Sequence, residues 1–165
     1  QQGFDASMRF IELPDRMMIV YQFQRVWREI WKDGRQLPAK VDAEGAPDAR
    51  YYGFSVGHWD GDYSFVIDTT GTDSRTWLDN EGHPHSSDLH VVERYTRLDQ
   101  NTLALTLTIN DPQIYTKPFD WITNAKLYTK PDPGFSETLC LPSEALTYRE
   151  SLVVPTGVGS SGPAK

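Results

Sequence analysis

The chain has 165 residues, of which 38% are hydrophobic and 24% charged, and its formal net charge at pH 7 is −7. This length predicts one domain with a core of its own, and an acidic chain without a cluster of Lys and Arg is not expected to bind nucleic acid. No apolar run approaches the roughly 20 residues of a membrane-spanning helix, so we expect no membrane span.

Eight segments alternate apolar and polar residues or are rich in β-branched and aromatic residues. An alternation with a period of two is typical of an antiparallel strand with one face toward the core. Within residues 26–31, for example, Arg28 shares a face with Ile30. Trp27 and Trp31 share the opposite face. In chain order, the expected strands are residues 9–14, 17–23, 26–31, 51–59, 63–69, 89–98, 102–110 and 121–129.

The segments between the expected strands carry turn and loop signals. Asp60-Gly61, between two aromatic-rich strands, indicates a tight hairpin turn. Residues 39–49 have the composition of a surface loop. Residues 154–165 are poor in apolar side chains and are expected to form a flexible tail, which leaves residues 1–153 as a single domain. One short helix is possible near the C-terminus, with Ser143 as its N-cap.

These elements predict an all-β fold, in which an antiparallel meander of about eight strands closes into a lipocalin-like barrel. Closure removes the exposed edges of such a meander, and a barrel of this size can hold one small ligand. The aromatic residues outnumber what the core needs, so some are expected to line a cavity for a flat or apolar ligand. The candidate ligand-binding residues are Trp27, Trp31, Trp59, Trp77, Tyr115 and Arg94.

Residues 82–94 hold three of the four histidines of the chain. His83, His85 and His90 form a ligand-rich pattern with Glu93, because imidazole and carboxylate groups suit zinc, copper or iron. Strand alternation, however, places His90 and Glu93 on opposite faces, where they cannot bind one ion without a bulge. We therefore expect no cofactor and keep a transition metal at His83, His85 and His90 as the alternative to an ordinary turn.

An acid–base site is a second functional interpretation of the same stretch. Asp79 lies close to His85 in sequence, and a carboxylate that orients a histidine is a common general-base arrangement. The structural alternative is that Asp79 caps a turn and Trp77 closes one end of the barrel. The serines that follow His85 do not lie in a G-x-S-x-G motif, which is typical of serine hydrolases. Cys140 has a leucine on each side, so we interpret this cysteine as a core residue and not as a nucleophile.

Two segments combine basic and acidic residues. Arg28 and Arg35 flank the turn at Asp33-Gly34 and could bind an anion, although pairing with the neighbouring acids is the expected outcome. Glu93 and Arg94 lie in an expected strand, where we expect cross-strand ion pairs on the solvent face.

Six motifs occur along the chain: VWREIWKDGRQLP (26–38), YGFSVGHWDGD (52–62), TWLDNEGHPHS (76–86), ERYTRLD (93–99), TLTINDPQIYTKPF (106–119) and CLPSE (140–144). Together they resemble a family of uncharacterised exported bacterial proteins that is abundant in acidobacteria and some proteobacteria. The resemblance covers about residues 20–145. It implies a β-rich fold and a periplasmic or extracellular location, and it supplies no activity.

The chain departs from the pattern of this family at two points. Relatives often carry an N-terminal Cys-Pro segment, which would give Cys140 a disulfide partner. Positions 83 and 90 vary among relatives, which weakens the three-histidine metal site. The residues that the resemblance favours for testing are Asp79, His85, Glu93 and Arg94.

Three functions are consistent with these observations. The first is an exported barrel that binds a small apolar or aromatic molecule. The second is a cofactor-independent lyase, isomerase or hydrolase in which His85, oriented by Asp79, is the general base and an arginine holds an anionic substrate. The third is a structural or assembly subunit that forms a homo-oligomer by adding its tail or N-terminus to the sheet edge of a neighbour.

Overall fold

The computed structural model describes residues 7–22, 26–79, 81–130 and 134. The chain divides into two units, residues 1–133 and 134–165, and the description below concerns the first. The expected C-terminal helix, the tail at 154–165 and Cys140 lie outside the described residues. The described part of the chain contains no helical segment with the length and hydropathy to span a bilayer.

The described part of the first unit has eight strands, and each of the eight predicted segments overlaps one of them. The strands are β1 (Met8–Glu12), β2 (Arg16–Tyr21), β3 (Trp27–Trp31), β4 (Phe54–Asp60), β5 (Ser64–Thr70), β6 (His90–Arg97), β7 (Thr102–Asn110) and β8 (Phe119–Tyr128).

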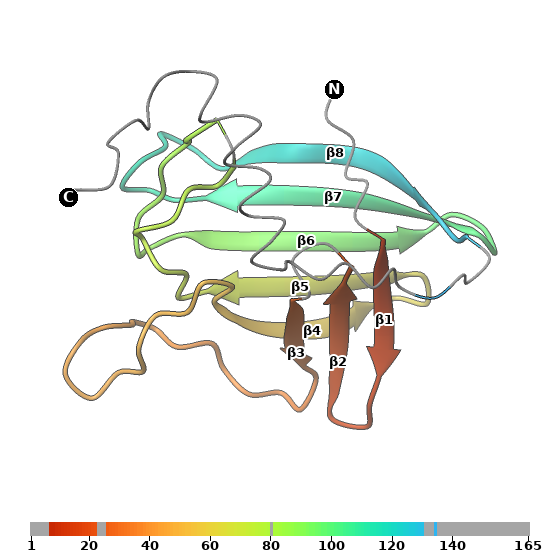
Figure 1. Cartoon of the computed structure of the whole chain (residues 1–165), viewed down its shortest axis with the longest axis horizontal. Helices are drawn as coiled ribbons and strands as arrows, with labels where there is room; N and C mark the ends of the chain where they lie inside the picture. The colour runs from red at the N-terminus through yellow and green to blue at the C-terminus, as the bar shows by residue number, and fades with distance from the viewer. Residues whose placement is uncertain (1–6, 23–25, 80, 131–133, 135–165) are drawn as a thin grey trace, which may run out of the picture. The chain divides into compact units, whose positions relative to one another are not determined.

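The strands form one sheet in the order β1 to β8, so that each strand lies beside its neighbours in sequence (Figure 1). All neighbouring pairs are antiparallel except β3 and β4, which are parallel. Parallel strands need a long connection that returns the chain to the same end, and residues 32–53 supply it. The fold departs from the predicted antiparallel order at this one pair.

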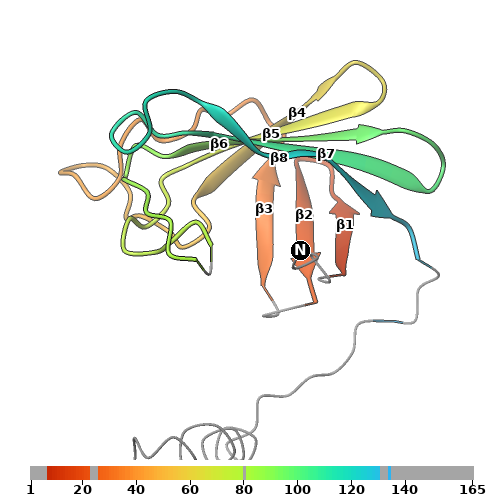
Figure 2. The same cartoon turned by 90° about the horizontal axis from the view of Figure 1, so that it is seen from above.

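The sheet curls into a half-barrel, which confirms the all-β, lipocalin-like prediction. Figure 2 shows β1–β3 as one limb that turns steeply away from the limb formed by β4–β8. The change of direction falls at the parallel pair β3–β4. Within the described residues, the terminal strands β1 and β8 are not paired with each other.

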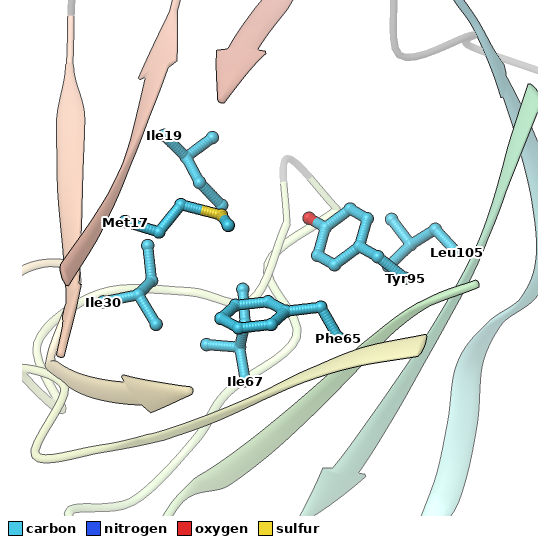
Figure 3. Close-up of a cluster of buried hydrophobic side chains, with 7 residues drawn as sticks. All are labelled: Met17, Ile19, Ile30, Phe65, Ile67, Tyr95 and Leu105. Atoms are coloured by element: carbon cyan, nitrogen blue, oxygen red, sulfur yellow. The ribbon is translucent and has the colours of Figure 1, made fainter. Parts of the chain in front are cut away.

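The core lies between the two limbs, on the concave face of the sheet. Because side chains alternate along a strand, Ile19 and Ile30 of the first limb face Ile67 and Leu105 of the second. Ile19, Ile30 and Ile67 are fully buried, and burying such a side chain stabilises a fold by about 1.5–3 kcal/mol. The cluster consists of Met17, Ile19, Ile30, Phe65, Ile67, Tyr95 and Leu105 (Figure 3).

A glycine in β4 allows the two limbs to pack closely. A Cβ atom at Gly57 would lie 2.6 Å from Ile30 Cγ2 and 2.6 Å from Phe65 Cζ. Real Cβ atoms do not approach other atoms this closely, so a larger residue would push these two side chains away. The absence of a side chain at Gly57 therefore lets Ile30 and Phe65 pack over β4.

Candidate functional site

A groove of about 530 Å³ opens beside the junction of β3 and β4. The two strands pair through Ile30 with Ser55 and Trp31 with Val56. Residues 27–29 and 50–54 precede this contact on the two sides and line the groove together with residues 35–38. Its volume lies within the usual range of small-molecule sites.

Aromatic side chains form much of the groove wall. Trp27, Tyr51 and Tyr52 are 63%, 71% and 44% exposed, and Trp31 and Phe54 are half-buried. Apolar surface that gathers in one exposed place is a common mark of a binding site, whereas single exposed rings are ordinary.

Guanidinium groups pack on these rings and hold them in place. Arg35 Cζ lies 3.4 Å from the centroid of the Trp31 ring, and Arg50 Cζ lies 4.2 Å from that of Phe54. Both distances are within the range of cation–π interactions. Arg35 also forms an ion pair of 2.6 Å with Asp33, whose pKa is lowered by this hydrogen-bonded guanidinium.

Arg28 is the buried arginine of the groove, with a side chain that is 12% exposed. Its Nη2 donates to Glu93 Oε2 at 2.7 Å, and its Nη1 donates to Glu93 Oε1 at 3.1 Å. Burial alone would lower the pKa of Arg28, but the Glu93 carboxylate outweighs this effect and raises the pKa. Further hydrogen bonds join Arg28 to Ser55, Thr69 and Tyr21.

One atom of Arg28 is left without a partner. Its Nε is buried and has no hydrogen-bond acceptor among the described residues. Buried donors are nearly always satisfied in proteins, so this N–H is an exception that calls for an acceptor.

The expectation that Glu93 pairs on the solvent face is wrong, because Glu93 is 5% exposed and bonds Arg28 inside the sheet. Alternation gives the reason: Glu93 shares a face with Tyr95, as Arg28 shares one with Ile30. The sequence signal for this pair was a charged residue, Arg28 or Glu93, on the otherwise apolar face of each strand. Arg94, on the opposite face, does pair on the surface, with Asp60 at 2.7 Å.

His85 is buried and both of its ring nitrogens are engaged. Nδ1 donates to the backbone oxygen of Ser86 at 3.0 Å, and Nε2 lies 2.9 Å from Thr76 Oγ1. Neither His85 nor Asp79 lines the groove. His85 therefore ties its own loop together.

Asp79 orients a different histidine from the one expected. Its Oδ2 lies 2.8 Å from Nδ1 of His83, and its Oδ1 accepts from the backbone amide of Glu81 at 2.9 Å. Burial alone would raise the pKa of Asp79, but the hydrogen bonds from His83 and the amides lower it. The hydrogen-bonded pair is thus Asp79–His83, not Asp79–His85, and Asp79 caps a turn as the structural alternative held.

The three histidines proposed as metal ligands have separate partners. His83 bonds Asp79, and His90 Nε2 lies 2.8 Å from Asp68 Oδ1. Within the described residues, the potential metal ligands that lie together are Asp79, Glu81 and His83, with ligand atoms within 4.8 Å of one another. The structure therefore does not gather the set His83, His85 and His90, and an exposed group of this kind is common without an ion.

A buried aspartate fastens the connection between β5 and β6 that carries His83 and His85, which we call the histidine loop, to the end of β7. Asp111 is 1% exposed, and its carboxylate accepts from the backbone amide of Ser86 at 2.6 Å and from Ser86 Oγ at 2.7 Å. Hydrogen bonds to a charged acceptor are the stronger kind, so the contact fixes where His85 and Ser86 lie.

Only two of the six predicted ligand-binding residues, Trp27 and Trp31, line the groove. Trp59 packs edge-on against Phe65 and Trp77 is 69% exposed on the histidine loop. Tyr115 donates its hydroxyl to the Pro84 oxygen at 3.0 Å, and Arg94 pairs on the surface. The arginines and aromatic residues of the groove that are absent from that prediction are Arg28, Arg35, Arg50, Tyr51, Tyr52 and Phe54. The closely spaced aromatics at 51, 52 and 54 were the signal for part of this set.

No family model matches this sequence, and neither the curated proteins nor the solved structures contain a match to it.

Proposed function

We propose that the protein binds a small apolar or aromatic molecule in the groove beside β3 and β4. The observation that carries this proposal is the gathering of five aromatic side chains around one volume of about 530 Å³, with Trp27 and Tyr51 mostly exposed. A ligand that covers these rings would remove apolar surface from water, which is worth about 25 cal/mol per Å².

The geometry of the wall supports a flat ligand. Aromatic rings attract one another edge-to-face or in offset stacks, and the cation–π contacts on Trp31 and Phe54 hold two of the rings in place. A wall that is already ordered loses little conformational entropy on binding, so less of the free energy of its contacts with the ligand is offset.

The enzyme alternative has less support. His85 has both ring nitrogens engaged, and Asp79 bonds His83. A general base must lie within hydrogen-bond reach of the proton that it removes from the substrate, and His85 is buried outside the groove. The proposed function is therefore binding without catalysis.

The proposed location is the periplasm or the cell exterior, and it rests on the family resemblance. Fractionation of cells that make the full-length gene product tests it: the protein is expected with periplasmic or medium markers. Recovery with cytoplasmic markers would overturn the proposed location and leave the groove argument unchanged.

Titration of the purified chain with the neutral probe N-phenyl-1-naphthylamine tests the proposed function. We expect saturable fluorescence enhancement, and we expect Trp27→Ala to weaken the affinity about tenfold, the factor that about 1.4 kcal/mol of lost stacking and burial produces. Trp27 is 63% exposed, so its truncation should leave the unfolding midpoint nearly unchanged.

Trp77→Ala is the matched control, because Trp77 is 69% exposed and does not line the groove. We expect this variant to bind like the parent. Equal affinities of all three proteins for the probe, or no saturable binding by the parent, would refute the groove as the binding site.

A further inference from the structure

Four charged side chains line the groove, and three of them already have a partner of opposite charge. The exception is Arg50, which forms no ion pair with any residue that the structure describes. Its guanidinium lies over the ring of Phe54 on the exposed side of the groove. The paired residues are Arg28 with Glu93, Glu29 with Arg16, and Arg35 with Asp33.

The groove therefore carries one uncompensated positive charge. This sign is opposite to that of the whole chain, whose net charge is −7. A local cationic site on an acidic protein attracts an anion of low charge, because each further negative charge is repelled by the rest of the molecule.

Arg28 offers a second feature at the same site. Its Nε–H is buried without an acceptor among the described residues, and Arg28 is one of the groove-lining residues. Because this atom has almost no solvent-accessible surface, a ligand oxygen would satisfy the donor only after the side chains that cover it have shifted. Because the donor belongs to a guanidinium, the resulting bond would be of the strong, charge-assisted kind.

From these observations we infer that the ligand is a planar aromatic carboxylate with a single negative charge. Arg50 supplies the attracting charge, Arg28 Nε–H supplies a hydrogen bond, and the aromatic wall packs on the body of the ligand. A carboxylate matches the forked donors of a guanidinium, and the net charge of −7 favours a ligand with one negative charge over a dianion. This inference rests on the proposed function and names the class of its ligand.

Isothermal titration of the full chain with three ligands of one ring system tests the inference. The ligands are 2-naphthoate, its neutral methyl ester, and 2-naphthyl phosphate at about pH 8, where the phosphate carries about two charges. We expect 2-naphthoate to bind at least about tenfold more tightly than the ester, because the unpaired charge of Arg50 attracts the carboxylate and not the neutral ester. We expect the dianion to bind more weakly than the carboxylate.

Arg50→Gln removes the uncompensated charge at an exposed position. It should abolish most of the preference for 2-naphthoate over the ester and leave the affinity for the ester unchanged. Arg97→Gln is the matched control, because Arg97 is exposed on β6 and lies outside the groove. That variant should keep the parent's preference.

Each remaining outcome has a distinct meaning. If the ester binds as tightly as 2-naphthoate, the inferred anion selectivity is wrong and the proposed function stands. Tighter binding of 2-naphthyl phosphate overturns the choice of a monoanion. Binding of none of the three ligands, together with failure of the neutral probe, would remove the proposed function as well.

Discussion

Arg28 and Glu93 form a two-point ion pair inside the curled sheet, with Nη1–Oε1 and Nη2–Oε2 distances of 3.1 and 2.7 Å. The pair joins β3 to β6 and therefore connects the two limbs. It complements a β3–β4 contact of only two residue pairs. The Tyr95 hydroxyl also donates a hydrogen bond of 3.2 Å to Glu93 Oε1, so the carboxylate accepts hydrogen bonds from both Arg28 and Tyr95.

Glu93→Gln is expected to lower the free energy of unfolding by about 3–5 kcal/mol, because it leaves the buried Arg28 charge without its counter-ion. Urea unfolding followed by fluorescence measures the loss. The double variant Arg28→Met/Glu93→Leu should regain much of it, since neither charge is then buried. Asp60→Asn breaks the exposed pair with Arg94 and should cost no more than about 1 kcal/mol. A loss as small as this for Glu93→Gln would contradict the importance of the buried pair.

Tyr95 should make the protein less stable in base. Burial, and then the Glu93 carboxylate, raise the pKa of Tyr95 well above its usual value. The unfolded chain ionises its tyrosines near pH 10 while folded Tyr95 keeps its proton, so ionisation favours unfolding as the pH rises beyond about 10. Tyr95→Phe should flatten the fall of the urea midpoint between about pH 9 and 11. Tyr128→Phe, at a position 64% exposed, is the control and should leave the slope as in the parent.

Asp73 should contribute to unfolding in acid. Its carboxylate accepts hydrogen bonds from the guanidinium and the backbone amide of Arg75, which lower its pKa to about 2. The unfolded chain protonates aspartate near pH 4, so the stabilisation is present above about pH 4 and is lost as the pH falls through about 2. Asp73→Asn should show a weaker dependence of the unfolding midpoint on pH in this window. An unchanged dependence would mean that the Arg75 contact does not persist in solution.

Gly57→Ala should destabilise the core by about 1–3 kcal/mol, the usual cost of overpacking. The new methyl group would meet both Ile30 and Phe65. Thermal unfolding measures the change. Adding Phe65→Leu to the variant should reduce the penalty of the alanine, because it removes the aromatic ring that the new methyl group meets. If the penalty is the same in both backgrounds, the close approach is not its cause.

Asp111→Ala should loosen the histidine loop. Loss of the carboxylate leaves the Ser86 amide without its acceptor, and hydrogen bonds to charged groups are worth about 1.5–3 kcal/mol. Hydrogen exchange of the Ser86 and Leu89 amides should accelerate more than exchange in β5. Uniform acceleration over the whole sheet would instead indicate a global loss of stability.

The strands could be predicted from the sequence because the alternation of apolar and polar residues within a strand follows which of its side chains face the core. In residues 103–109, leucine or isoleucine at every second position predicts one apolar face, and Leu105 and Ile109 on that face of β7 are buried. The same rule placed Arg28 with Ile30 and Glu93 with Tyr95. It could not say that these two charged residues meet, because their partnership depends on how the limbs fold over each other.

The groove could be predicted only in part, since its residues come from segments without a regular period. Residues 35–38 and 50–53 belong to the long connection, and only the tertiary structure brings them beside Trp27 and Trp31. The same limit explains the error at Asp79. Nearness in sequence to His85 suggested a pair, but the turn directs the carboxylate to His83 and to local amides.

The long connection between β3 and β4 has a consequence for how the protein folds. Inside each limb, the strands pair with their neighbours in the chain. The β6–β7 ladder closes across the short turn at residues 98–101, a step that costs little entropy. Packing the β1–β3 limb against the β4–β8 limb requires the ordering of residues 32–53, so we expect it to be slower than pairing of strands across a short turn. In a refolding experiment with pulsed amide labelling, protection should reach the β6–β7 ladder before it reaches Ile30 and Trp31. The groove, built at that joint, would then be the last part of the first unit to take shape.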